Sequence, residues 1–127
     1  MRKTLMLLVT MAAVTSGCAR SENPLRGHEF ESQNDMTKII LIFDKDEMRL
    51  RGKVVNVYTA SYELSGDNMI VGRMASTMMM PIGNAADVER EYFKFMSDSE
   101  PKQISLKDGI LTITDHSGKS FEFEKVK

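Results

Sequence analysis

The chain has 127 residues, of which 17 are basic and 18 acidic, so its formal net charge is −1. This balance excludes the strongly basic surface that binding to nucleic acid or to an anionic membrane requires. With one cysteine and two histidines, the sequence also lacks the residues of a disulfide framework or a zinc site. The length corresponds to one domain with one hydrophobic core.

The first 17 residues have the features of a secretory signal peptide. Met1-Arg2-Lys3 supplies a positive start, and residues 5–14 are apolar but too short to span a bilayer. Thr15-Ser16-Gly17-Cys18 resembles the lipobox of bacterial lipoproteins, in which the cysteine receives a diacylglycerol before cleavage. We therefore expect a covalent lipid on Cys18 and no other cofactor.

Lipidation would use the only cysteine and leave a mature domain without a disulfide. Removing residues 1–17 leaves 15 basic and 18 acidic side chains, a net charge near −3. Residues 18–24 are expected to form the lipidated cysteine and a short polar tether, and residues 25–127 the domain. Ala19 follows the cysteine where enteric lipoproteins of the inner membrane have Asp. We expect a monomer anchored in the cell envelope, at the outer membrane, facing the periplasm or the cell surface.

The predicted elements begin with residues 37–43, which are apolar on both faces and indicate a strand covered on two sides. Asp44 to Glu47 is a predicted turn. Further short strands are predicted at 48–51, 54–58, 60–64 and 69–72, with a turn at 65–68. Residues 74–80 are expected to form another strand, with Met74, Met78 and Met80 on one face.

One helix is predicted to follow, with Asn84 as its N-cap and Asp87 placed as in a capping box. Its apolar stripe consists of Ala85, Val88, Tyr92 and Met96. The last strands are expected at 103–106, 109–114 and 119–124, with a turn at 115–118. One helix is therefore predicted among many short strands.

Several short motifs occur in a fixed order from Leu25 to the C-terminus. They are Ile42-Phe43, Gly52, Asn56, Tyr58, Ser61-Tyr62, Ala75-Ser76-Thr77-Met78-Met79, Glu89 or Glu91 with Phe93, Leu111-Thr112-Ile113, and Gly118 with Phe121. Their order and spacing resemble the META-domain family, which includes HslJ-like heat-shock lipoproteins. The resemblance implies an α+β fold, with a curved, mainly antiparallel β-sheet or half-barrel packed around one helix.

The sequence departs from this family at two places where a cysteine is common, near Val55 and Met80, so thiol chemistry is absent here. Phe30 stands where the family commonly has Trp. The resemblance implies an envelope protein that is not an enzyme and that in some bacteria is tied to heat shock and to novobiocin resistance.

Two clusters have the residue types of a chemical site but not the arrangement. Asp115-His116-Ser117 has the letters of a catalytic triad, yet three consecutive residues in a turn cannot form the relay. Asp44 to Glu47 offers oxygen ligands without the glycine and distal acid of a calcium loop. We therefore predict no catalytic residue and no metal site.

The methionines of residues 74–80 allow three interpretations. Met fills irregular cores, so core packing is the first expectation, and an adaptable apolar binding surface is the second. The third is a Cu(I) site, because thioethers suit soft ions. An outward-facing Met79 would also be open to oxidation.

The candidates for a binding or structural motif are Asn56, Tyr58, Tyr62, Arg73, Thr77 and Met78. The Asn56 amide is expected to fix a tight corner by hydrogen bonds to the backbone. The alternative is a shallow ligand or peptide groove lined by Asn56, the two tyrosines and Arg73.

Three functions remain open at this point. The first is a lipid-anchored, non-catalytic envelope protein that binds another envelope component in envelope stress or integrity. The second is a small-molecule or lipid binder with an apolar pocket. The third is an adaptor that offers a sheet edge or groove to a peptide of a secretion or assembly machine. Nucleic acid is not an expected partner.

Lipidation of Cys18 can be tested directly. We expect the Cys18→Ser variant to lose incorporation of a labelled fatty acid and to leave the membrane fraction, because its acyl chains provide the membrane affinity. Metabolic labelling followed by cell fractionation measures both effects. Equal labelling of the variant and the wild type would contradict the lipoprotein prediction.

Overall fold

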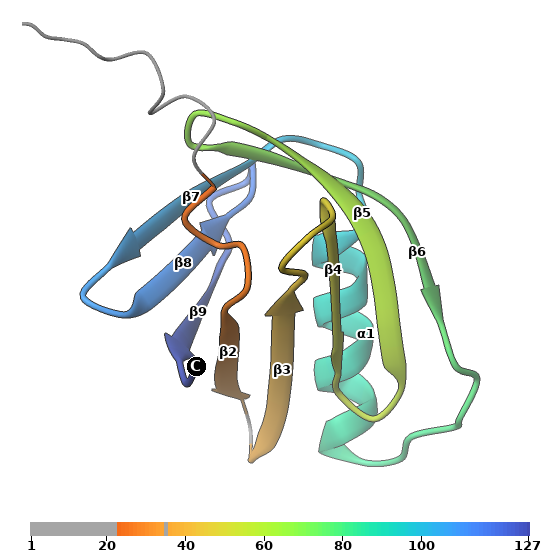
Figure 1. Ribbon diagram of the computed structural model, residues 1–127. Coiled ribbons are helices and arrows are strands. Elements are labelled where there is room, and N and C mark those ends of the chain that lie inside the picture. The colour runs from red at the N-terminus through yellow and green to blue at the C-terminus, as the bar shows by residue number, and fades with distance from the viewer. Residues whose placement is uncertain (1–22, 35) are drawn as a thin grey trace, which may run out of the picture.

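The computed structural model describes residues 23–34 and 36–127 and shows a closed antiparallel β-barrel with one helix (Figure 1). The strands are β2 (Glu29–Asn34), β3 (Thr37–Phe43), β4 (Arg49–Lys53), β5 (Val57–Ser65), β6 (Asn68–Ser76), β7 (Lys102–Lys107), β8 (Ile110–Thr114) and β9 (Ser120–Lys125). Helix α1 (Asn84–Met96) lies between β6 and β7 in the chain. The predicted signal peptide, Cys18 and most of the tether lie outside the described residues.

The barrel is closed by two short pairings, and elsewhere neighbouring strands pair along most of their length. The paired positions are Phe30–Lys125 and Glu31–Glu124 between β2 and β9, and Asn68–Gln103 and Met69–Lys102 between β6 and β7. The predicted curved, mainly antiparallel sheet with one helix is confirmed, but the sheet closes into a full barrel rather than a half-barrel. Closure depends on β2, whose sequence has a single apolar residue, Phe30, and therefore no strand pattern.

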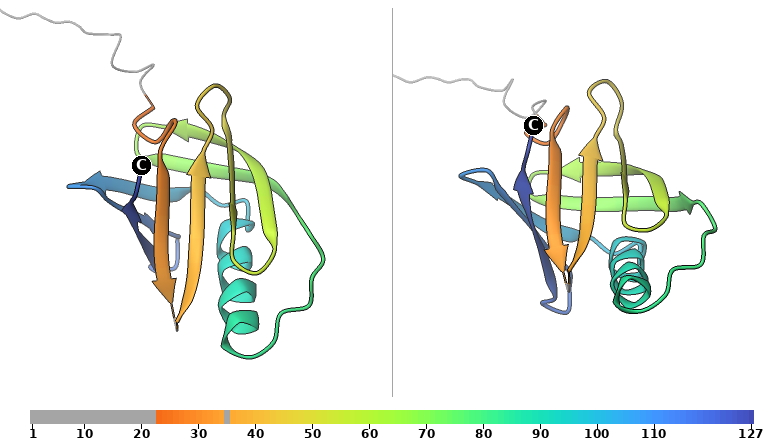
Figure 2. Two further views of the ribbon diagram at one scale, coloured as in Figure 1. Left: turned by 60° about the horizontal axis from the view of Figure 1, so that its bottom comes forward. Right: turned by 90° about the horizontal axis from the view of Figure 1, so that it is seen from below.

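The two ends of the barrel carry different segments (Figures 1 and 2). Residues 23–28 lead into β2 at one end, called here the N-terminal end, where the β3–β4 and β5–β6 turns also lie. The β2–β3 turn, residues 54–56 and the end of β6 lie at the opposite end, called here the far end. Asn23 is fixed at the N-terminal end because its Nδ2 donates a hydrogen bond to the Tyr62 hydroxyl at 2.7 Å.

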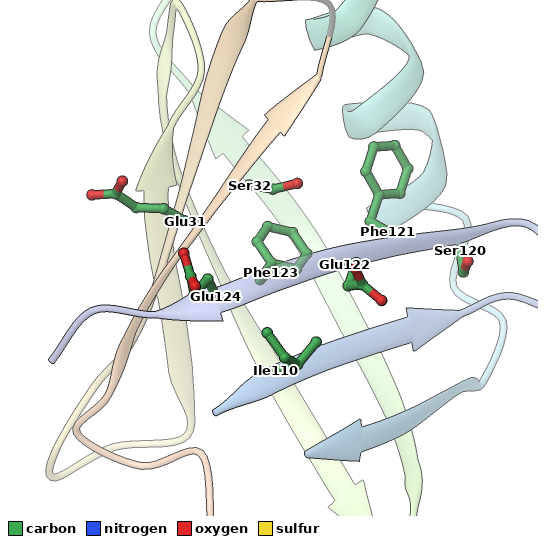
Figure 3. Close-up of a pocket in the computed structure, with 8 residues that line it drawn as sticks. All are labelled: Glu31, Ser32, Ile110, Ser120, Phe121, Glu122, Phe123 and Glu124. Atoms are coloured by element: carbon green, nitrogen blue, oxygen red, sulfur yellow. The ribbon is translucent and has the colours of Figure 1, made fainter. Parts of the chain in front are cut away.

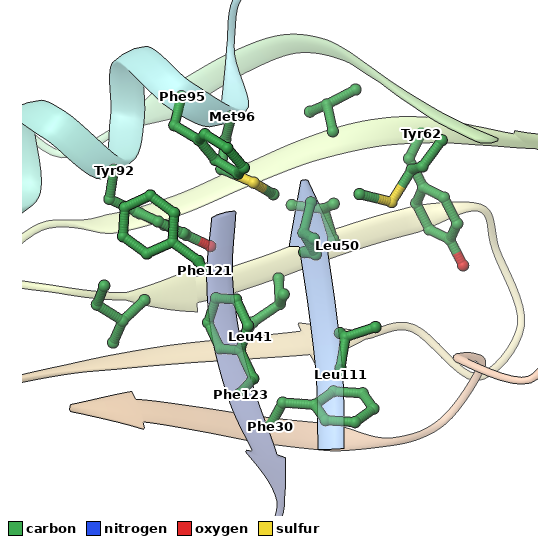
Figure 4. Packing of buried hydrophobic residues seen from close by; sticks show 14 of the residues in the cluster. Phe30, Leu41, Leu50, Tyr62, Tyr92, Phe95, Met96, Leu111, Phe121 and Phe123 are labelled. Atoms are coloured by element: carbon green, nitrogen blue, oxygen red, sulfur yellow. The ribbon is translucent and has the colours of Figure 1, made fainter. Parts of the chain in front are cut away.

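Alternate residues of the strands face inward and form one apolar core (Figure 4). In β3, Ile39, Leu41 and Phe43 are buried, as expected from their alternation. Ile40 and Ile42 on the outer face are only half-buried. The prediction that this strand is covered on two sides is therefore right for the inner face alone.

Helix α1 joins two parts of the barrel wall through aromatic contacts. The Tyr92 ring lies 5.5 Å from Tyr58 of β5 and 5.4 Å from Phe121 of β9, measured between ring centroids. Phe95 lies 4.7 Å from the same Phe121 ring. These edge-to-face and tilted contacts hold the helix against strands that are far apart in the barrel order.

Two strands, β5 and β6, replace four predicted ones. Residues 57–65 are continuous apart from a bulge between Ala60 and Tyr62, and residues 54–56 belong to the β4–β5 turn. The prediction of a strand at 74–80 is wrong beyond Ser76. Met74 is half-buried against the core, but residues 77–82 leave the sheet.

The predicted capping box at Asn84 is also wrong. The N-cap is Gly83, with a φ of 69°, and no side chain caps the helix. Asn84 is already the first helical residue, so its side chain no longer points at the free amides of the first turn. Glycine suits this position because L side chains rarely adopt a positive φ.

Gly52 allows a tyrosine to cross the neighbouring strand. A Cβ atom at this position would lie 1.9 Å from the Ile40 carbonyl oxygen and 2.5 Å from the Tyr58 hydroxyl. The Tyr58 hydroxyl donates to that same carbonyl at 2.7 Å. The absence of a side chain at Gly52 is therefore what makes room for this hydrogen bond.

Gly52→Ala tests this packing. We expect it to lower the free energy of unfolding by about 3 kcal/mol or more, because backbone atoms have to move to admit the methyl group. Gly72→Ala is the matched control, since its Cβ would approach closely the rotatable Ser61 hydroxyl, at 2.6 Å, while the Ser61 carbonyl oxygen would lie at an ordinary contact distance of 3.5 Å. Urea unfolding measures both, and equal losses would contradict the stated role of Gly52.

Candidate functional site

The most exposed apolar segment of the described chain is the connection between β6 and α1, residues 77–83, called here the Met loop. Met78, Met80 and Ile82 are 90, 89 and 85 % exposed, and Met79 is 53 % exposed. Figure 1 shows this segment extending away from the barrel at the far end. The expectation that these methionines fill the core is wrong. The second interpretation, an adaptable apolar surface, fits their exposure.

The base of the Met loop is held by Asn56. Its Oδ1 accepts hydrogen bonds from the Met79 amide at 2.6 Å and from the Thr77 hydroxyl at 2.8 Å. Its Nδ2 donates to the Met79 carbonyl at 3.1 Å. Thr77 is further bound to Val57, whose carbonyl accepts from its amide and whose amide donates to its hydroxyl. The backbone is thus fixed while the Met78 and Met80 side chains project.

Asn56 is itself positioned by a buried carboxylate, that of Glu89 on α1, which is 6 % exposed. Glu89 Oε1 accepts from the backbone amides of Val55 and Asn56 at 3.0 and 2.7 Å. Its Oε2 accepts from Asn56 Nδ2 at 2.8 Å. These three donors satisfy a charge that would otherwise be costly to bury. The result links the helix, the β4–β5 turn and the Met loop.

The position of Glu89 on the helix is the sequence signal for its buried role. This residue lies four positions after Ala85 and three before Tyr92, on the apolar stripe of the predicted helix. An acid at a stripe position must find donors in the core or leave it. Its partner could not be named because Asn56 is distant in sequence.

The predicted tyrosines lie in the core rather than on a binding surface. Tyr58 donates to the Ile40 carbonyl, so the Tyr92 hydroxyl, 2.6 Å away, has to be the donor to Tyr58. Burial raises the pKa of both Tyr58 and Tyr92 well above the usual range, so both stay protonated. Tyr62 is buried near the N-terminal end. The hydrogen-bonded pair of Tyr58 and Tyr92 therefore has the properties of a structural contact.

Of the six candidate residues, the structure brings three together. Asn56, Thr77 and Met78 belong to the Met loop or its base. Tyr58 and Tyr62 point into the core, and Arg73 is exposed on β6.

The acidic clusters are turns, as their sequences indicated. Asp115 Oδ1 accepts from the Ser117 amide and hydroxyl and from the Lys119 amide. Asp44 Oδ2 accepts from two backbone amides, at Asp46 and Glu47, each at 2.8 Å. Within residues 23–34 and 36–127, no group of three or more His, Cys, Asp or Glu side chains is arranged to hold a metal ion.

One buried cation also has a structural explanation. Lys102 is fully buried beside the β6–β7 pairing, where its ammonium donates to Asp98 Oδ1 at 2.5 Å and lies 5.6 Å from the centre of the Phe95 ring. Burial acts to raise the pKa of Asp98, but hydrogen bonds from Lys102 and from the Glu100 amide outweigh it and hold this pKa below its usual range.

The described surface of the barrel includes two open grooves of similar size. One, of about 670 Å³, runs between β2 and β9 beyond their last pair and is lined by Glu31, Ser32, Ile110 and residues 120–124 (Figure 3). The other, of about 710 Å³, lies between α1 and the β8–β9 turn and mixes acidic and basic residues around Phe95.

In the part of the chain that is described, no helix has both the length and the apolar character needed to cross a membrane.

Together these features define a small β-barrel with one packed helix and an apolar loop held at one end. The chain belongs to the META domain family, whose model matches residues 22–127. This family is not a known enzyme family. No curated protein matches the chain.

Two solved structures have a similar fold. One NMR structure matches with a TM-score of 0.64 and 16 % identity over 79 % of this chain and 90 % of its own. An NMR structure of a protein from Burkholderia xenovorans matches with a TM-score of 0.63 and 15 % identity over 97 % of this chain and 99 % of its own. At these identities the likeness establishes the fold alone.

Asn56→Ala tests the anchoring of the Met loop. We expect a loss of about 2–4 kcal/mol in the free energy of unfolding, because Glu89 loses a donor and the Met79 amide its acceptor. Hydrogen exchange at the Met79 amide should become fast. Thr77→Val is the control, since it keeps both Asn56 bonds to Met79 and should cost about 1 kcal/mol. Unchanged protection of the Met79 amide in Asn56→Ala would contradict the anchoring of the Met loop by Asn56.

Proposed function

We propose that this protein is a non-catalytic binding module of the cell envelope. A lipid on Cys18 holds it at the membrane, and the Met loop docks into an apolar groove of another envelope protein. The observation that supports this most is the combination of exposed Met78, Met80 and Ile82 side chains with a backbone fixed by Asn56. Exposed apolar side chains on an ordered backbone are typical of interaction sites.

The partner is expected to be a protein rather than the anchoring membrane. The chain enters the barrel at the N-terminal end, and the Met loop lies at the far end. Strands of seven residues such as β3 separate the two ends by about 20 Å. A tether of about five residues reaches at most roughly 17 Å when fully extended. An anchored barrel therefore directs the Met loop away from the lipid.

The composition of the Met loop indicates the character of the partner. No charged residue occurs between Arg73 and Asp87. A complementary surface would be uncharged and apolar, because a charged groove would lose its hydration without gaining a partner. Methionine adapts to grooves of different shape, so recognition depends on burial more than on hydrogen bonds.

The expected affinity is modest. Burying an exposed Met or Ile side chain stabilises a complex by about 1.5–3 kcal/mol, and three such side chains provide roughly 5–9 kcal/mol before the costs of association. Such docking is transient in solution. Confinement of both partners to the envelope raises their effective concentration and offsets this weakness.

The groove between β2 and β9 supports a second candidate, an adaptor for an extended peptide. Among the described residues, these strands pair at two positions only and then diverge. Glu31, Glu122 and Glu124 stand around the opening, and the Phe121 and Phe123 rings lie on the opposite face of β9 (Figure 3). This acidic rim favours a peptide with basic side chains. The described side chains that face the barrel interior form one apolar cluster, which favours the two surface-binding proposals over a ligand pocket inside the barrel.

The docking proposal is tested by photo-crosslinking in living cells. We expect a photoreactive amino acid in place of Ile82 to capture one defined protein. The same group in place of Arg90, on the exposed face of α1, should not capture it. Replacing Met78 and Met80 by Ser in the Ile82 sample should lower the yield about tenfold or more, since apolar burial is lost.

Controls separate docking from anchoring and folding. The Met36→Ser variant removes an equally exposed methionine in the β2–β3 turn and should leave the yield unchanged. Cys18→Ser should lower the yield by releasing the protein from the membrane. Equal capture from positions 82 and 90, or a yield that does not respond to the Met78 and Met80 changes, would contradict docking through the Met loop.

A further inference from the structure

The methionines of this chain differ widely in access to solvent. Met78 and Met80 are almost fully exposed, whereas Met69 and Met96 are fully buried. The rate at which an oxidant reaches a thioether sulfur follows this exposure. Met78 and Met80, which dominate the proposed docking surface, are therefore also among the methionines whose sulfur atoms are most accessible to oxidants.

We propose that Met78 and Met80 are sites of reversible oxidation to methionine sulfoxide, and that this modification releases the docked partner. This inference rests on the proposed function for its consequence, although the modification itself does not. The substrate class is a small two-electron oxidant of the envelope, with hydrogen peroxide as the simplest case.

Oxidation of each methionine to the sulfoxide consumes one molecule of hydrogen peroxide. The thioether sulfur attacks one peroxide oxygen, an S–O bond forms and the O–O bond breaks. The other oxygen leaves as hydroxide and becomes water by taking the proton of the sulfur-bound hydroxyl, so the sulfur is oxidised by two electrons to the sulfoxide. A dithiol-dependent methionine sulfoxide reductase reverses the change: the thiols become a disulfide, and the sulfoxide oxygen leaves as water.

The surroundings of the two side chains limit the effect of oxidation to docking. The bonds that hold the Met loop use the backbone of Met79 and the hydroxyl of Thr77, not the side chains of Met78 and Met80. Oxidation therefore leaves the hydrogen bonds of Asn56 to the Met loop and the core in place. It adds a strong hydrogen-bond acceptor to each tip, which an apolar groove cannot satisfy.

The exposed position also makes the change reversible. A reductase has to take the oxidised side chain into its own active site, which requires a side chain that projects from the surface. Met78 and Met80 meet this requirement, whereas Met69 would need the barrel to open.

The modification is tested on the full lipidated protein in membrane nanodiscs. Samples are treated with hydrogen peroxide, and sulfoxide at each methionine is quantified over time by peptide mass spectrometry. We expect oxidation at Met78 and Met80 to be at least tenfold faster than at Met69 and Met96. Similar rates at these four residues would overturn the assignment of the sites.

The consequence is tested by crosslinking from position 82 in cells. Peroxide should lower the yield at least fivefold in the wild-type sequence, and expression of the reductase should restore it. The Met78→Leu, Met80→Leu double variant keeps the apolar side chains without the sulfur and should crosslink equally with and without peroxide. Met36→Leu is the control for an exposed methionine outside the Met loop.

The outcomes distinguish the two proposals. A wild-type yield that peroxide leaves unchanged, or an equal loss in the double leucine variant, overturns the switch while docking stands. Absence of crosslinking in every sample overturns docking and the switch together, and the mass spectrometry still decides whether Met78 and Met80 are oxidised faster than the buried methionines.

Discussion

The hydrogen-bonded pair of Asn56 and Glu89 is the interaction on which the candidate site depends. The Asn56 amide uses its oxygen for two donors and its nitrogen for two acceptors, so neither atom is left unpaired. Glu89 places a carboxylate in the core, where it accepts hydrogen bonds from three donors of one turn. The pair joins a helix, a turn and the Met loop at a single point. Removing the Asn56 side chain takes one of three donors from the buried Glu89 carboxylate, and removing that carboxylate leaves two backbone amides of the turn without their acceptor.

This arrangement reconciles two opposing requirements in a small domain. A binding surface has to expose apolar side chains, while a chain without a disulfide has to bury as many as it can. The barrel and α1 bury one continuous aromatic and aliphatic core, and the Met loop adds almost nothing to it. The Met loop can expose its apolar side chains because polar contacts hold its backbone, so its conformation does not depend on burial of those side chains.

Local chemistry predicted the turns, and most strands and the helix, better than it predicted the closure or the Met loop. Asp44 and Asp115 satisfy backbone amides within their own turns, which short-range pattern can reveal. Closure requires β2, with one apolar residue, to meet β9 from the other end of the chain. Alternation of Met74, Met78 and Met80 describes a one-faced strand but cannot say whether anything covers that face.

The end of β6 explains why the alternation was misleading. Thr77 still donates its amide to Val57, as a strand residue would. Two residues later the Met79 amide goes to the Asn56 side chain instead of to a strand carbonyl. A side-chain amide thus competes with the sheet for the backbone and ends the strand. The interaction that ends β6 is therefore the same one that exposes the methionines, so the position of the proposed docking surface follows from Asn56 rather than from the methionines themselves.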